Sequence, residues 1–256
     1  MEDTVSFKAG FKWNLKYTKR FALSFSNAVF DPLNWICPLH VQNRLLLRDL
    51  WSQKYAWDKS FHQDETLVKR WNYLRQNCFA AMDIKMKLDI RIRDETQIHV
   101  FTDASIQAYG AVLYLVTPKS REYPEGEVFM IKAKAKIVPV DKNPTEDTMP
   151  RWELASIVVG AKLLVFVLDA VPQLIGKPVF IWNDNKPSLC WCSQTTIKDT
   201  YVHNRVKDIR EKCPTAILRY VPTDDNPADI LTRDITAQDL KKCRRWWYAT
   251  EWITNQ

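Results

Sequence analysis

The chain of 256 residues carries a formal net charge of +7, and its hydrophobic and charged fractions of 46% and 26% are typical of globular proteins. This composition excludes wholesale disorder, collagen and coiled coil, and the length allows a core that needs no disulfides. None of the 5 glycines lies in a G-x-G-x-x-G or G-x-x-x-x-G-K-[ST] motif, which excludes nucleotide-binding enzymes of those two types.

The first part of the chain predicts a small helical module. Residues 1–30 show no clear period and are expected to be a lead-in of unknown order. Within 31–95, apolar residues that recur every three or four positions predict two amphipathic helices. The first lies around 41–51 with Trp51 at the end of its apolar face, and the second lies over 65–82 with Leu67, Trp71, Leu74 and Cys78 on one face. The alternation of apolar and basic residues over 83–95 is typical of a linker or an edge strand.

A different pattern begins at Gln97 and predicts a mixed domain over 96–235. Alternating and apolar runs indicate three successive strands, and Thr148 and Pro150 are start signals for a long, nearly apolar helix that should be buried. The order β-β-β-α-β-α-β-α indicates an α/β or α+β domain, followed by a basic, Trp-rich tail over 236–256. The predicted elements are strands at 97–105, 108–116, 128–138, 179–184 and 216–222, and helices at 151–170, 200–212 and 226–235.

Four carboxylates occupy the ends of these elements. Asp103 ends the first strand, Glu153 lies in the first turn of the long helix, Asp184 ends the fourth strand, and Asp229 lies in the first turn of the last helix. Each alone could cap a turn or complement a helix dipole. If the strands of Asp103 and Asp184 are parallel neighbours, however, their carboxyl ends meet at one edge, where α/β sheets tend to build sites. Such a cluster would repel itself unless cations neutralise it, and oxygen ligands favour a pair of Mg²⁺ or Mn²⁺ ions suited to phosphodiester hydrolysis.

Four ordered motifs resemble the ribonuclease H region of BEL/Pao-type LTR retrotransposon polyproteins. FTDAS (101–105) with AYGAVLYL (108–115) resembles the first aspartate motif and second strand, and MPRWELASIVVGAKLL (149–164) resembles the Pro-Arg-x-Glu helix. VFIWNDNKPSLCW (179–191) is similar to the Trp-x-Asp strand end, and RYVPTDDNPADILTR (219–233) to the Asn-Pro-Ala-Asp element.

The resemblance extends to both flanks. Residues 30–58 are similar to the segment that follows the polymerase palm, and 244–253 resemble the Trp-rich tail after the ribonuclease H domain. The resemblance therefore implies a ribonuclease H-like fold, a five-stranded mixed sheet with flanking helices, preceded over 31–95 by a thumb or connection segment of a reverse transcriptase.

The resemblance also implies an activity: metal-dependent cleavage of the RNA strand of RNA–DNA hybrids within a reverse-transcription machinery. Asp103 and Asp184 would hold two Mg²⁺ or Mn²⁺ ions, Glu153 one ion and a water near the 2′-OH, and Asp229 the second ion's water. The expected partners are the hybrid and other polyprotein segments, without a membrane or a small-molecule cofactor.

Other residues compete for roles at this site. Asp224 and Asp225 are alternatives to Asp229, although Asp225 is better explained as the cap of the last helix. His203 could shuttle protons, but its position on a surface helix favours an ordinary histidine. Weak nucleic-acid contacts are predicted for Ser105, Asn185, Arg205 and Arg210.

Two other functions remain open. A catalytically decayed fragment that only binds nucleic acid or acts as a scaffold is suggested by Tyr220, where the family has His, and by the lack of a Tyr-x-Asp-Asp polymerase motif. Asn183 and Asn185 also replace the more common Thr and Ser around Asp184. An integrase or transposase is disfavoured, because its essential Glu lies on a late helix whereas Glu153 lies on the first long one.

The sequence also predicts a compartment. The 6 cysteines form no C-x-x-C pair, which suits free thiols in a reducing environment rather than a zinc site. The first residues have no apolar core, and no window approaches the ~18 apolar residues of a membrane span. We therefore expect a protein of the cytoplasm, including virus-like particles, or of the nucleus, that is not secreted.

Overall fold

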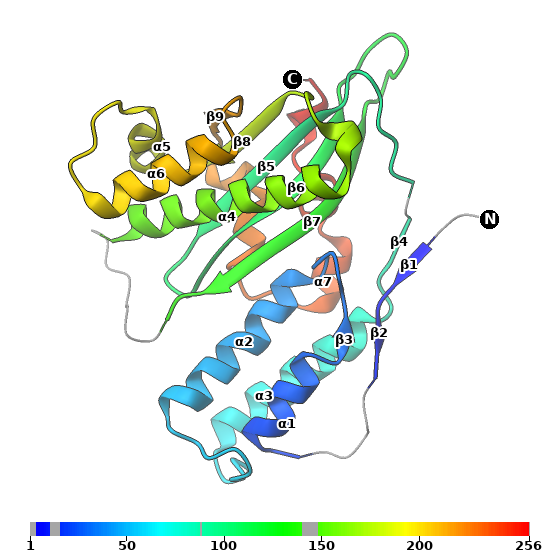
Figure 1. Cartoon of the computed structure of the whole chain (residues 1–256). Helices are drawn as coiled ribbons and strands as arrows, with labels where there is room; N and C mark the ends of the chain where they lie inside the picture. The colour runs from blue at the N-terminus through cyan, green and yellow to red at the C-terminus, as the bar shows by residue number, and fades with distance from the viewer. Residues whose placement is uncertain (1–3, 11–15, 88, 140–147, 256) are drawn as a thin grey trace. The chain divides into compact units, whose positions relative to one another are not determined.

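The computed structural model describes residues 4–10, 16–87, 89–139 and 148–255 (Figure 1). Residues 1–3 and 11–15 of the predicted lead-in, and 140–147 of the predicted mixed domain, lie outside the described residues. The contacts divide the chain into two compact units. The first comprises residues 1–89, 139–142 and 234–243, and the second comprises residues 90–138, 143–233 and 244–256.

The first unit is mostly helical, as the apolar periodicity predicted for its two main helices. On α3 the side chains of Leu67, Trp71, Leu74 and Cys78 are all buried, as expected for one face of the helix. Trp51 at the end of α2 was expected on the buried face but is 54% exposed, because its ring lies against the ammonium of Lys19 at 3.7 Å instead of entering the core. The elements of this unit are α1 (Lys19–Ser26), α2 (Cys37–Ser52), α3 (Glu65–Ala81), α7 (Ala237–Lys242), and the antiparallel pairs β1 (Thr4–Ser6) with β4 (Lys85–Lys87) and β2 (Lys8–Ala9) with β3 (Val29–Phe30).

The second unit is built on a mixed sheet in the order β7-β6-β5-β8-β9 (Figure 1). The first three strands form the predicted antiparallel meander, while β8 lies parallel to β5 and β9 parallel to β8. Phe101 pairs with Trp182, so the residues two positions further along the chain, Asp103 in β5 and Asp184 just after β8, lie at the same edge. The strands are β5 (Gln97–Ala104), β6 (Ala108–Thr117), β7 (Glu127–Ile137), β8 (Val179–Asn183) and β9 (Ile217–Tyr220).

One face of this sheet is covered by α4 (Met149–Ala170), and α6 (Thr200–Lys212) packs on α4. The long helix approaches the sheet closely at Gly160, where an added Cβ would lie 2.8 Å from Cγ2 of Thr102 and 3.0 Å from Cγ1 of Val100. Two short elements in this region were not predicted. They are η1 (Pro172–Leu174) and α5 (Lys186–Ser193), the latter capped by Asn185.

The segment after β9 differs from the prediction of a helix over 226–235. It forms two short 3₁₀ turns, η2 (Thr223–Asp225) and η3 (Pro227–Leu231), followed by α8 (Arg244–Tyr248) and η4 (Glu251–Asn255) in the tail. The reason is a tertiary contact: the buried amide of Asn226 caps η3 and also donates to the carbonyl of Thr102 in β5, which fixes the chain to the sheet at the turn. Among the described residues, no helix combines the length and the apolar character that crossing a bilayer requires.

Candidate metal centre

Three of the four predicted carboxylates come together at the carboxyl edge of β5 and β8. Asp103 belongs to β5, Asp184 follows β8 directly, and Glu153 is the fifth residue of α4. One oxygen from each lies within 4.8 Å of the other two. Asp103 and Glu153 are only 4% and 6% exposed, whereas Asp184 is half-buried, so the cluster is open to solvent on the side of Asp184.

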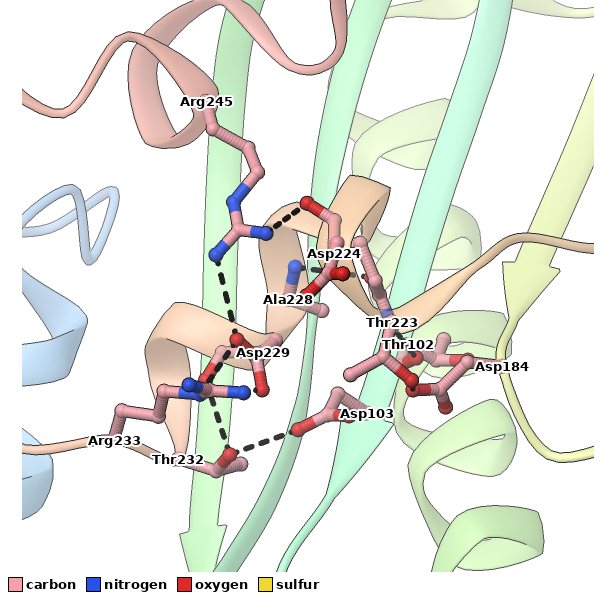
Figure 2. Close-up of polar contacts among 11 residues, drawn as sticks. Thr102, Asp103, Asp184, Thr223, Asp224, Ala228, Asp229, Thr232, Arg233 and Arg245 are labelled. Atoms are coloured by element: carbon pink, nitrogen blue, oxygen red, sulfur yellow. Dashed lines mark hydrogen bonds and ion pairs between the residues drawn. The ribbon is translucent and has the colours of Figure 1, made fainter.

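Neutral groups hold these carboxylates in place. Thr232 Oγ1 donates to Asp103 Oδ2 at 2.8 Å, and Thr223 Oγ1 donates to Asp184 Oδ2 at 2.8 Å (Figure 2). Asn183 Nδ2 lies 3.1 Å from Glu153 Oε2. These donors orient the acids without neutralising their charge.

Burial is the main cause that raises the pKa of all three acids, and neighbouring carboxylates add to it. For Asp103, burial and then the charge of Asp184 raise the pKa to about 8. These effects outweigh the Thr232 hydroxyl and the Arg233 charge, which lower the pKa. Burial, followed by the charges of Asp103 and Asp184, holds the pKa of Glu153 well above its usual range. Burial also raises the pKa of Asp184, against the lowering effect of the Thr223 hydroxyl.

This donor set fits a hard divalent cation. Three carboxylates that cannot all ionise comfortably next to one another gain a compensating charge when a cation lies between them. Oxygen-only ligands of this kind suit Mg²⁺ or Mn²⁺ better than zinc. Asp103, Glu153 and Asp184 are therefore the residues that would hold the metal.

The raised pKa of Asp103 has a consequence for stability. A carboxyl whose pKa is raised in the folded state contributes stability that is present below its unfolded pKa of about 3.9 and is lost as the pH rises through about 8. With divalent ions chelated, we expect wild type to lose roughly 3 kcal/mol of unfolding free energy relative to Asp103→Asn between about pH 5.5 and about pH 8.5. Urea titrations of both proteins at the two pH values measure this. A difference in unfolding free energy between the two proteins that does not change with pH would contradict the raised pKa of Asp103. Saturating Mg²⁺ should reduce the loss of stability between the two pH values.

Asp229, the fourth predicted ligand, is held differently. It is 6% exposed and makes a two-pronged contact with Arg233, whose Nε lies 2.8 Å and 2.7 Å from its two oxygens. Arg245 Nη2 lies 3.4 Å from Oδ2 of the same carboxylate (Figure 2). Its charge still contributes to the raised pKa of Asp103 and of Asp184, so it borders the cluster of three without being one of its members.

The competing acids have their own partners. Asp225 accepts from Trp252 Nε1 at 3.2 Å and does not cap the last helical turn, because Asn226 does. Asp224 is exposed, and its backbone carbonyl accepts from Arg245. His203 is exposed on α6, as the interpretation of an ordinary surface histidine predicted.

Each of the four residues that were predicted to contact nucleic acid makes a contact within the fold. Ser105 Oγ accepts from the backbone N–H groups of Gln107 and Ala108 in the β5–β6 turn. Asn185 caps α5. Arg205 lies over the ring of Tyr201 at 3.3 Å, and Arg210 donates to the carbonyl of Cys192 at 3.0 Å. A role of these residues in binding nucleic acid stays a prediction.

The sequence reasoning missed the residues that orient the acids. Thr223, Thr232, Arg233 and Arg245 were not singled out, and Asn183 was noted only as a departure from the family pattern. The available signal was weak: Thr232 and Arg233 follow Asp229 within one turn, and Thr223 stands beside the two competing aspartates.

The family model described as "Pao retrotransposon-like RNaseH-like domain" matches residues 18–185, which include Asp103, Glu153 and Asp184 but end before Asp229. No curated protein matches the chain.

Three solved structures illustrate the structural likeness. LC11-RNase H1 from compost, in complex with an RNA/DNA hybrid, is 12% identical with a TM-score of 0.34, over 57% of this chain and 99% of that one. RNase H1 of Halobacterium salinarum NRC-1 is 11% identical with a TM-score of 0.33, over 53% and 92%. A foamy viral protease-reverse transcriptase in complex with double-stranded DNA is 14% identical with a TM-score of 0.44, over 81% of this chain and 33% of that one.

Proposed function

The chain belongs to the family of Pao retrotransposon-like RNaseH-like domains, and on that premise we propose that it is a metal-dependent endonuclease that cleaves the RNA strand of RNA–DNA hybrids. The observation that carries this proposal is the cluster of Asp103, Glu153 and Asp184, whose oxygens lie within 4.8 Å of one another. A family match alone would indicate a fold, whereas a clustered set of buried acids indicates chemistry.

The proposed roles follow from the positions of the acids. Asp103 and Asp184, at the ends of two parallel strands, would hold Mg²⁺ or Mn²⁺ together with Glu153 from the helix above them. When bound as a pair, such ions activate a water and stabilise the leaving oxygen of a phosphodiester. Asn183, Thr223 and Thr232 would keep the carboxylate oxygens oriented. A metal-binding role for Asp229 would require it to leave its contacts with Arg233 and Arg245.

Selection of the hybrid would come from shape and sugar chemistry. A duplex that contains RNA has an A-like form and 2′-hydroxyls along its minor groove, which a protein can recognise without reading bases. The chain's net charge of +7 favours binding to phosphates in general and supplies no sequence preference. We place this activity within a reverse-transcription machinery of the cytoplasm, including virus-like particles, or the nucleus, alongside other segments of the polyprotein.

Incubation with labelled duplexes tests the proposal. The purified chain with Mg²⁺ should cut the RNA strand of an RNA–DNA hybrid, leave its DNA strand and a double-stranded DNA of the same sequence intact, and stop when EDTA is added. Cleavage of double-stranded DNA as fast as the hybrid, or cleavage unaffected by EDTA, would contradict it.

Binding without cleavage is the second candidate. It is favoured by the state of Asp229, which is paired with two arginines rather than turned toward the three clustered acids. In the same assay this candidate predicts an intact hybrid together with a stable complex in a gel-shift experiment.

A further inference from the structure

Residues 223–233 connect the two aspartates of the metal centre to the rest of the fold. Thr223, at one end of this segment, donates to Asp184, and Thr232, near the other end, donates to Asp103. Both contacts are 2.8 Å long (Figure 2). The position of this one segment therefore sets the orientation of two of the three clustered carboxylates.

The sheet holds the segment through Asn226 and through the buried residues of η3, which contact β5 and β6. Asn226 is fully buried and donates to the carbonyl of Thr102 at 3.0 Å. Thr232 lies six positions after Asn226, and its Oγ1 lies within hydrogen-bond distance of the carbonyl of Asp229 as well as of Asp103. A displacement at Asp229 is thus passed directly to the hydroxyl that contacts Asp103.

Residues 244–255 contact the segment at three further points. Arg245 donates to the carbonyl of Asp224 and pairs with the carboxylate of Asp229 (Figure 2). Trp252 Nε1 donates to Asp225 Oδ2 at 3.2 Å. One arginine therefore joins η2 to η3 across Asn226.

These residues can act as a support because they are themselves fixed to the sheet. Trp246 is fully buried, and its carbonyl accepts from the hydroxyl of Tyr114 in β6 at 2.6 Å. The backbone N–H of Lys119 donates to the carbonyl of Thr254 at 2.7 Å. Arg245 therefore extends from a rigid base, with its side chain only 31% exposed.

We propose that Arg245 is a positioning residue of the metal centre, which acts through Asp224 and Asp229 on the hydroxyls of Thr223 and Thr232 and so on Asp184 and Asp103. The inference rests on the proposed function, because it assumes that these carboxylates bind a divalent ion. In this arrangement Asp229 is the attachment point through which Arg245 acts on Thr232. Groups that orient metal ligands from behind affect affinity strongly, because small shifts of the ligand oxygens are costly.

The test measures Mn²⁺ binding directly, by electron paramagnetic resonance of the free ion, on the full chain. Arg245→Ala should weaken Mn²⁺ affinity about tenfold, and Arg245→Lys should recover part of the loss, because lysine keeps one of the two contacts. The matched control is Arg244→Ala, which removes the neighbouring exposed arginine, whose contact is with the ring of Tyr248, and should leave affinity unchanged.

A double-mutant cycle tests whether Arg245 acts through Asp229. If it does, the variant Arg245→Ala with Asp229→Asn should bind Mn²⁺ no more weakly than the worse of the single variants. Losses that add in the double variant would show that Arg245 acts independently of Asp229 and would overturn the proposal.

Folding is checked for each variant by circular dichroism and thermal denaturation. If Arg245→Ala does not fold, Trp252→Phe provides the second probe: it keeps an aromatic ring against Trp182 but removes the donor to Asp225, and should weaken Mn²⁺ affinity about threefold. Wild-type affinity in whichever of these variants folds would overturn the proposal. A wild-type chain that binds Mn²⁺ but does not cut hybrids would refute the proposed function alone, because the affinity differences would still test Arg245.

Discussion

Asp103→Asn and Asp184→Asn should each lower the rate of hybrid cleavage by at least about a thousandfold, equivalent to about 4 kcal/mol of transition-state stabilisation. Each substitution keeps the shape of the side chain but removes one of the charges that would hold the metal at the edge of β5 and β8. Single-turnover rates with saturating Mg²⁺ measure the loss.

The matched control for these variants is Asp169→Asn. Asp169 is exposed near the end of α4, and the helical rise places it about 24 Å from Glu153 on the same helix. This variant removes the same charge from the same unit and should cleave at the wild-type rate. Equal losses in all three variants would mean that net charge, and not the clustered carboxylates, sets the rate.

Trp246→Ala should lower the free energy of unfolding of the second unit by about 4 kcal/mol, the usual cost of deleting a buried tryptophan side chain. Trp246 is fully buried although it lies in the tail that follows the ribonuclease H-like sheet. Its loss would leave a cavity and loosen the contact between its carbonyl and the Tyr114 hydroxyl.

The neighbouring exposed aromatic residue supplies the comparison. Tyr248 lies on the same short helix and is 51% exposed, so Tyr248→Ala should change the unfolding free energy by less than about 0.5 kcal/mol. Because the chain has two units, urea unfolding should be followed by hydrogen exchange of the β5 and β6 amides, which reports on the second unit alone. A loss below about 1 kcal/mol for Trp246→Ala would show that the tail does not stabilise this sheet.

The elements that depend on local pattern were predictable. The three-or-four spacing on α3 and the apolar runs of β5, β6 and β8 are visible in any short window, and the burial of Trp71, Leu74 and Cys78 confirms the face that the spacing indicated. The elements that were missed are short. α5 has eight residues with little apolar periodicity, and η3 replaces a predicted α-helix because Asn226 is held by Thr102, which lies 124 residues away in sequence.

The same difference between local pattern and long-range contact applies to the candidate site. The convergence of Asp103 and Asp184 could be anticipated, because each ends an apolar strand and parallel neighbours place such ends together. The partners of these acids could not. Thr232 reaches Asp103 across 129 residues and Thr223 reaches Asp184 across 39, and nothing in the local sequence distinguishes these threonines from others.

The amino-acid sequence alone determined the class of the fold, the family resemblance and the meeting of three of the acids. Hydrophobic periodicity and carboxylates at strand ends are local properties, so they can be read from short stretches of sequence. Only the folded chain decided how Asp229 is used, since whether a carboxylate faces a cation site or an arginine depends on which side chains arrive from elsewhere. Here Arg245 arrives from the tail, beyond the last strand of the sheet. Its packing follows from the burial of Trp246, a long-range contact that no single stretch of sequence encodes.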